Sequence, residues 1–147
     1  MSLKEQLLED MKVAMRQKDA VSKNAIQMAR AAILQIEKDN RITLDDDGII
    51  DVIAKEVKKR RDVLPDYEKS GRQDLADELK AEINALMKYL PRQLTEEELE
   101  AIVRQTVDET GASSPRDMGK VMQAVMPKVK GRADGKVVSA IVKRILG

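Results

Sequence analysis

Carboxylates are the side chains of this sequence that could carry out catalysis, because the usual catalytic groups are missing. The 147 residues include no cysteine and no histidine, which excludes thiol catalysis, cysteine-ligated zinc and the commonest general base and metal ligand. Acidic residues cluster at 45–47 and in the run EEELE at 96–100. We interpret both clusters as helix starts, with a magnesium site at 45–47 as the alternative. We therefore expect no catalytic residue, no metal and no cofactor.

Basic residues form two groups that could bind a polyanion. The first lies in the run KEVKKRRD at 55–62 and is either a solvated helix face or a secondary basic patch. Its members are Lys55, Lys58, Lys59, Arg60 and Arg61. The second group lies between Arg116 and Arg144, where eight bases accompany two acids, whereas residues 96–109 have six acids and a single base. Such one-sided charge is typical of nucleic-acid binding.

Glycines accompany the second basic group. Gly119 interrupts an apolar helical pattern, and a glycine in a helix costs about 1 kcal/mol relative to alanine. We therefore expect its backbone to be approached closely, either by a neighbouring helix, which we favour, or by a ligand. Gly131 and Gly135 of GRADGK are explained as a helix-end glycine and a turn glycine. The same stretch leads into a helix start, so we also expect free amide donors there, beside basic side chains that suit phosphate.

Helical periodicity runs through the whole chain, and no segment alternates convincingly with the period of a strand. Seven helices are expected. Their start signals are Ser2 with Glu5, Thr43 or an aspartate of 45–47, Thr95 with Glu98, Ser114 with Pro115, and Asp134. Helix stops are expected at Gly71, Pro91 and Gly111. Pro65 is expected to kink the third helix or to break it near its end.

These signals divide the chain within YLPRQLTEEEL, at 89–99. We predict an all-α protein with an N-terminal helical hairpin-type domain at 1–92 and a small three-helix C-terminal bundle at 93–147. The 42% of apolar residues are enough for a core. The opening MSLKEQLLEDMK has no apolar run typical of an export signal, and no membrane span is visible. We therefore expect a cytoplasmic protein without a membrane partner.

Four stretches of the sequence resemble the YqeY family of small bacterial proteins. In chain order they are EDMKVAMRQKD, YEKSGRQDL, YLPRQLTEEEL and DMGKVM…MPKVKGRADGKVV, and the resemblance covers essentially the whole chain. It implies an all-helical fold, with a C-terminal part similar to the tail domain of the B subunit of tRNA-dependent amidotransferase. In that enzyme the tail engages tRNA, and catalysis lies in other domains. Gln27 and Gln123 depart from the family pattern, where we expect a basic and a small residue, respectively.

Together with the charge pattern, the resemblance implies a tRNA-binding surface in the C-terminal part. Its expected residues are Arg116, Gly119, Lys120, Lys128, Lys130, Gly131, Arg132, Gly135 and Lys136. The chain has no Trp or Phe and two Tyr, so a platform of stacking aromatic side chains is not expected. Recognition of tRNA, or of another structured RNA, would instead use the phosphate backbone and its shape.

The sequence leads to the hypothesis of a non-catalytic tRNA-binding or tRNA-amidotransferase-associated protein. The activity attached to the family by resemblance is that of a carbon–nitrogen ligase with glutamine as amido donor. Without a cysteine nucleophile or a nucleotide-binding motif, we expect no intrinsic activity of this kind, and any such role would be that of a module associated with the amidotransferase or another tRNA-handling protein. The alternative function is a protein–protein interaction adaptor that uses the N-terminal helical hairpin.

Overall fold

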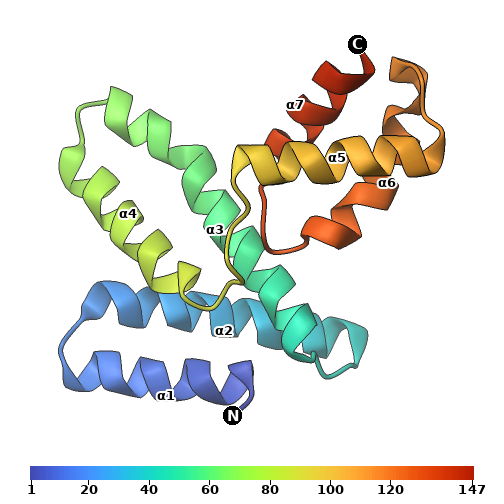
Figure 1. Ribbon diagram of the computed structural model, residues 1–147. Coiled ribbons are helices and arrows are strands. Elements are labelled where there is room, and N and C mark those ends of the chain that lie inside the picture. The colour runs from blue at the N-terminus through green and yellow to red at the C-terminus, as the bar shows by residue number, and fades with distance from the viewer. The chain divides into compact units, whose positions relative to one another are not determined.

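The computed structural model describes residues 1–147 and is built from helices, with no strand. The prediction of an all-α fold is confirmed. Figure 1 shows the helices in chain order. The α-helices are α1 Leu3–Arg16, α2 Ala20–Asn40, α3 Asp46–Lys69, α4 Gln73–Met87, α5 Glu96–Thr110, α6 Met118–Val129 and α7 Gly135–Leu146. A short 3-10 turn, η1 Pro115–Asp117, precedes α6.

The chain forms two compact units, Met1–Leu90 and Pro91–Gly147. In the first unit α1 lies along α2, and α4 packs on both α2 and α3. Its core includes Leu7, Ile26, Ile53 and Leu86, each at most 1% exposed. Burial of such aliphatic side chains stabilises the unit by about 1.5–3 kcal/mol for each side chain.

The second unit packs α5, α6 and α7 around a core of mainly β-branched residues. Val103, Val121, Val125 and Val138 are fully buried in it, and Leu99 from α5 is 2% exposed. The valines of α6 recur at a spacing of four residues, which places them on one stripe of the helix. The opposite stripe of α6 therefore faces solvent.

The helix starts follow the local signals of the sequence. Asp45 caps α3 by accepting a hydrogen bond from the backbone N–H of Gly48. Thr95 and Glu98 form a reciprocal capping box at the start of α5. Asp134 caps α7 as expected. At α1, the Ser2 hydroxyl accepts from the N–H of Glu5.

Of the two alternatives for Pro65, a kink or a break of the third helix, the structure excludes the break, and the assignment of Gly135 needs correction. Pro65 lies inside α3, which continues to Lys69. Pro65 has no backbone N–H, so the carbonyl of Arg61, four residues earlier, receives no helical hydrogen bond. Arg61 is exposed, and water can bind to its carbonyl instead. Gly135 is not a turn glycine but the first residue of α7, whereas Gly131 has the left-handed φ of +72° expected at a helix end.

Candidate nucleic-acid interface

The solvent-facing stripe of α6 gathers part of the predicted site. Gly119 and Lys120 lie exposed in its first turn, Arg116 is exposed in the preceding 3-10 turn, and Lys130 is exposed directly after the last turn. Gln123 and Pro127, also exposed, lie between them. We call Arg116, Gly119, Lys120, Gln123, Pro127 and Lys130 the α6 face.

The three cations of the α6 face are not neutralised within the protein. Arg116, Lys120 and Lys130 form no ion pair and no side-chain hydrogen bond, in contrast to Lys128 and Arg144. The α6 face also contains no carboxylate. The acid nearest to them in sequence is Asp117, whose carboxylate accepts from the N–H of Ser113. Unpaired cations suit a polyanion, because phosphates can bind them without displacing an internal partner.

Gly119 leaves the backbone of this face uncovered. A Cβ atom added at Gly119 would meet no other atom within 4 Å. The close packing of a neighbouring helix, which the sequence favoured, is therefore not the reason for this glycine. The backbone of the first turn of α6 is open to an approaching molecule, between two unpaired cations.

Lys128 has an internal role. Its Nζ lies 2.8 Å from Glu109 Oε2 and donates to Thr106 Oγ1 at 2.9 Å, so it joins α6 to α5. The hydrogen bond and charge of Lys128 lower the pKa of Glu109. The prediction that Lys128 binds RNA remains a prediction, but an incoming phosphate would have to compete with Glu109.

The GRADGK stretch is held by the segment that enters the second unit. Gln93 Nε2 donates to the carbonyl of Gly131 at 2.8 Å, and Leu94 N donates to the carbonyl of Arg132 at 2.9 Å. Arg132 Nε donates to the carbonyl of Arg92 at 3.3 Å. These contacts give the stretch a fixed conformation that the sequence reasoning did not identify, since Arg92, Gln93 and Leu94 showed no pattern pointing to it.

In GRADGK the amides of Arg132 and Lys136 have partners within the chain, so these two are not the free donors that the sequence led us to expect. Asp134 Oδ1 accepts from the N–H of Lys136 at 2.8 Å, and the carbonyl of Asp134 accepts from the N–H groups of Val137 and Val138. The carboxylate thus occupies the place at the helix N-terminus that a phosphate would take. The sequence did carry the signal, because aspartate is a preferred N-cap residue.

In the first unit the predicted basic patch loses one member. Arg60 is only 6% exposed and lies between two helices, with Nη1 donating to the Glu56 carbonyl at 3.0 Å and Nε 3.5 Å from Glu82 Oε2. Arg60 also lies 3.4 Å from Glu56 Oε1. It is therefore an internal cation, not part of a surface patch, because α4 supplies a carboxylate that the sequence of α3 alone does not show.

The remaining members of this patch also have local partners. Lys55 pairs with Asp51 at 3.8 Å, and Lys59 pairs with Glu56 at 3.0 Å. Lys58 lies 3.3 Å from Asp62 Oδ2, and Arg61 Nη2 lies 3.3 Å from the sulfur of Met87. The secondary patch is thus largely balanced by carboxylates of the same helix, which makes it a weaker polyanion site than the α6 face.

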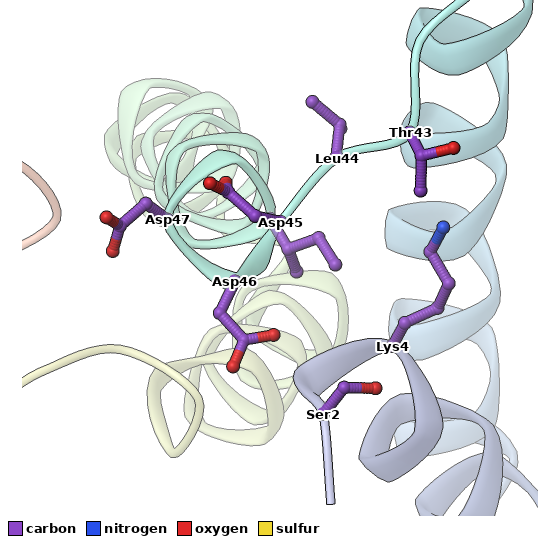
Figure 2. A pocket seen from close by; sticks show the side chains of 8 residues that line it. Ser2, Lys4, Thr43, Leu44, Asp45, Asp46 and Asp47 are labelled. Atoms are coloured by element: carbon purple, nitrogen blue, oxygen red, sulfur yellow. The ribbon is translucent and has the colours of Figure 1, made fainter.

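The acidic cluster at 45–47 lines a hollow of about 590 Å³ at the start of α3 (Figure 2). Asp45 caps its own helix, and Asp46 Oδ1 accepts from the N–H of Leu3 at 3.0 Å. Nearby, Lys4 pairs with Glu37 at 2.6 Å. No group of three acidic side chains in the chain is arranged to hold a metal ion, so the magnesium alternative gains no support.

Comparison with known proteins identifies the family. The model of the Yqey-like protein family matches residues 4–146. The chain belongs to the YqeY family. It is 28% identical over 141 residues to "Altered inheritance of mitochondria protein 41, mitochondrial" of Pyrenophora tritici-repentis, covering 94% of this chain and 77% of that relative.

Two further relatives match over shorter stretches. A protein of the same name from Candida glabrata is 35% identical over 86 residues, which are 57% of this chain and 47% of that relative. A subunit of the "Glutamyl-tRNA(Gln) amidotransferase" of Thermococcus gammatolerans is 44% identical over 55 residues, which are 35% of this chain and 9% of that relative. This last match supports the resemblance to an amidotransferase tail. In the structure no helix is both long and apolar enough to cross a membrane.

Proposed function

We propose that this YqeY-family protein binds structured RNA, with tRNA as the leading candidate, and that it does so without catalysing a reaction. The observation that carries the proposal is the α6 face, where Arg116, Lys120 and Lys130 have no internal partner, and where Arg116 and Lys120 lie on either side of the uncovered backbone at Gly119 in the sequence. A similar stretch in an amidotransferase named for Glu-tRNA(Gln) supports tRNA as the ligand class.

Within this proposal the predicted residues contribute unequally. The unpaired cations of the α6 face provide the main phosphate contacts. Lys128 and Arg132 are internally bonded and contribute to the local potential. Lys136 lies at the start of α7, where Asp134 caps its amide. Gly131 and Gly135 shape the connection between α6 and α7.

Any link to amidation is proposed as an association with the amidotransferase or with another tRNA-handling protein. The chain offers no cysteine nucleophile. The purified protein, given Glu-tRNA, glutamine and ATP, is expected to show no turnover without the amidotransferase itself. We keep the cytoplasm as the proposed compartment, although two relatives carry "mitochondrial" in their names.

A titration of tRNA at several salt concentrations tests the proposal. For a phosphate-based interface, log K falls linearly with log[salt], and each removed contact reduces the slope by about 1. We expect the triple variant Arg116→Ala, Lys120→Ala, Lys130→Ala to weaken binding and to reduce the slope by about 2–3. The matched control replaces three exposed lysines of the first unit, Lys12, Lys38 and Lys69, by alanine and keeps most of the affinity. Binding that ignores salt, or equal losses in the two triple variants, would contradict the proposal.

A second candidate function is supported by the exposed side of α2. Between Lys23 and Glu37 this helix contains a single charged residue, Arg30, and its side chains Met28 and Leu34 are 54% and 59% exposed. An uncharged, partly apolar helix side is typical of a protein-binding surface. If the protein is an adaptor, a pull-down from nuclease-treated extracts will recover a partner protein. The double variant Met28→Glu, Leu34→Glu should no longer bind that partner, whereas the α6 triple variant should still bind it. The adaptor hypothesis is contradicted if both variants still bind the partner, or if nuclease treatment abolishes the binding.

A further inference from the structure

The first unit concentrates positive charge in one stretch of its sequence. Residues 11–36 contain five bases and one acid, whereas the rest of the unit, residues 1–10 and 37–90, contains twelve bases and seventeen acids. The stretch forms the last part of α1, the turn that follows it and most of α2, and these two helices lie antiparallel, side by side (Figure 1). The first unit thus has one-sided charge, as the second unit does, although its total charge is close to zero.

Three cations around the turn between α1 and α2 have no partner within the protein. Arg16 is the last residue of α1, Lys18 lies in the turn and Lys23 is the fourth residue of α2. Arg16 and Lys18 are exposed, and Lys23 is half-buried. None of the three forms an ion pair or a side-chain hydrogen bond, in contrast to Lys12, which pairs with Glu9 at 3.6 Å. We call Arg16, Lys18 and Lys23 the turn patch.

Two members of the turn patch line a hollow of about 320 Å³. Its lining residues are Ala14, Met15, Lys18, Asp19, Ala20 and Lys23. The carboxylate of Asp19 accepts from the N–H of Ser22 at 3.1 Å. Hydrogen bonds from Ser22 and, to a smaller extent, the charge of Lys88 lower the pKa of Asp19. The one carboxylate of the hollow is therefore already bonded, whereas its two lysines are not.

We propose that the turn patch is a second phosphate-binding surface, which contacts the same RNA as the α6 face. The inference rests on the proposed RNA binding and extends it from the second unit to the first. Cations without a carboxylate partner gain most from a phosphate, because no internal contact has to be displaced. An RNA bound at one unit is also kept at a high effective concentration near the other, since the two units belong to one chain.

An acidic protein segment fits the turn patch less well than RNA does. A helix that docks on a protein surface needs apolar contacts as well as charge. Met15, at 57% exposed, is the only large apolar side chain that lines the hollow, and Ala14 is buried. The turn patch thus offers charge with little apolar area, and this combination suits phosphate groups.

A titration of tRNA against full-length variants at several salt concentrations tests the proposal. The turn triple variant, Arg16→Ala with Lys18→Gly and Lys23→Ala, is expected to weaken tRNA binding about tenfold or more and to reduce the salt slope by about 2–3. Combined with the α6 triple variant, the reduction should reach about 4–6, with one tRNA bound per protein. The triple-lysine control of the first unit should keep most of the affinity.

Lys18 and Arg41 allow the charge to be tested apart from the backbone. Both are exposed and have a left-handed φ, +58° and +52° respectively, so replacement by glycine keeps the fold. Arg41 lies at the other end of α2, with Asp39 and Asp45 close by in sequence. Lys18→Gly is expected to weaken tRNA binding about three- to tenfold and to reduce the slope by about 1, whereas Arg41→Gly should stay within about twofold. Lys18→Arg keeps the charge and should restore the affinity.

The variants distinguish failure of this inference from failure of the RNA proposal. If the turn triple variant matches the triple-lysine control while the α6 triple variant loses affinity, the turn patch is not an RNA contact and the RNA proposal stands. If only the turn triple variant loses affinity and slope, the first unit binds RNA and the α6 face is contradicted. Binding that ignores salt contradicts both.

Two further outcomes would overturn the shared contact. Two tRNA molecules per protein, one of them lost with each triple variant, would show that the two surfaces bind separate RNAs. A nuclease-insensitive protein partner that the turn triple variant no longer binds, with tRNA affinity unchanged, would show that the turn patch binds a protein.

Discussion

Neighbouring cations of the second unit differ in whether the protein itself already binds them. Lys128 lies between Glu109 and Thr106, and Lys120 in the same helix has no partner. The two residues are of the same type, so the difference comes from what α5 presents to each side of α6. A phosphate gains most from the lysine whose charge is not compensated, since displacing a carboxylate offsets the new contact.

This difference predicts unequal effects on RNA affinity. Lys120→Ala is expected to weaken tRNA binding about three- to tenfold and to reduce the salt slope by about 1. Lys128→Ala is expected to change the affinity and the salt slope less than Lys120→Ala. Removing Lys128 leaves Glu109 without its partner, so its main effect is on the packing of α5 and α6 and not on RNA binding. Filter binding at two salt concentrations distinguishes the variants, and a larger loss for Lys128→Ala would show that the GRADGK side, not the α6 face, makes the main contact.

Gly119 allows stability and binding to be separated. Because a Cβ there meets nothing within 4 Å, Gly119→Ala is expected to raise the free energy of unfolding by up to about 1 kcal/mol. If RNA approaches this backbone, the same variant binds tRNA more weakly. Urea unfolding and a tRNA titration measure the two effects.

Gly111→Ala is the matched control for this test, because the site is equally open but has a φ of +70°, so the substitution should destabilise the protein. A stabilised Gly119→Ala variant with unchanged tRNA affinity would show that the ligand does not reach the backbone there.

Glu98 gives the second unit a dependence on pH. Its hydrogen bonds with Arg92 and Thr95 lower its pKa to about 2. The stabilisation is therefore complete above the ordinary pKa of a glutamate, near 4.5, and is lost as the pH falls toward about 2. We expect Glu98→Gln to lower the unfolding midpoint at pH 7 and the difference from the unmodified protein to shrink at pH 3.

Thermal unfolding at pH 7, 5, 4 and 3 checks this dependence. Glu97→Gln, a neighbour without an ion pair in the structure, is the control and should give the same small difference at each pH. A difference for Glu98→Gln that is as large at pH 3 as at pH 7 would rule out the charge on Glu98 as its cause.

At the scale of helices, Arg60 connects three elements of the first unit. It lies on α3 between Glu56 of its own helix and Glu82 of α4, with Nη2 3.5 Å from the sulfur of Met28 on α2. Its Nε has no hydrogen-bond partner within 3.5 Å of good geometry. A buried ion pair of this kind does not guarantee stability, but removal of one partner leaves a buried charge uncompensated.

We therefore expect Arg60→Ala to lower the free energy of unfolding by about 3 kcal/mol or more. Lys59→Ala, one residue earlier and with 74% of its side chain exposed, should stay within about 0.5 kcal/mol. Arg60→Met keeps the volume and should lose less than Arg60→Ala. Urea unfolding measures all three, and equal stability of Arg60→Ala and Lys59→Ala would contradict the internal role of Arg60.

At the scale of the whole molecule, the chain consists of two compact units that meet in sequence at Leu90 and Pro91. The proposed domain boundary between residues 92 and 93 would separate Arg92 from the unit to which it bonds. Arg92 pairs with Glu98 at 2.7 Å and accepts from Arg132 through its carbonyl. Residues 92–94 are therefore a structural part of the second unit.

Fragments of the chain test this conclusion. A fragment of residues 91–147 is expected to fold and to unfold cooperatively, while a fragment of residues 95–147 loses the bonds from Arg92, Gln93 and Leu94 and should have a clearly lower unfolding midpoint. Circular dichroism during heating compares the two. If both fragments are equally stable, the hydrogen bonds of residues 92–94 with the GRADGK stretch do not stabilise the second unit in solution.

Features that depend on neighbours in sequence were predictable. The capping box of Thr95 and Glu98, the cap at Asp134 and the left-handed stop at Gly111 each involve residues within one turn, so local chemistry decides them. The helical fold follows from the same local signals together with the apolar period. The one-sided charge of the second unit is also a property of the sequence.

The tertiary structure decided which of the charged side chains have a partner within the protein and which remain free to bind a ligand. Lys128 is 19 residues from Glu109, and Gln93 is 38 residues from Gly131. Arg60 is buried because α4 brings Glu82 beside α3. No periodicity encodes such pairs, since they form only when helices dock. The sequence by itself determined seven helices and a basic stretch from Arg116 to Arg144. Only the packing showed that Arg116, Lys120 and Lys130 stay unpaired and that the open backbone of Gly119 lies on the exposed side of α6.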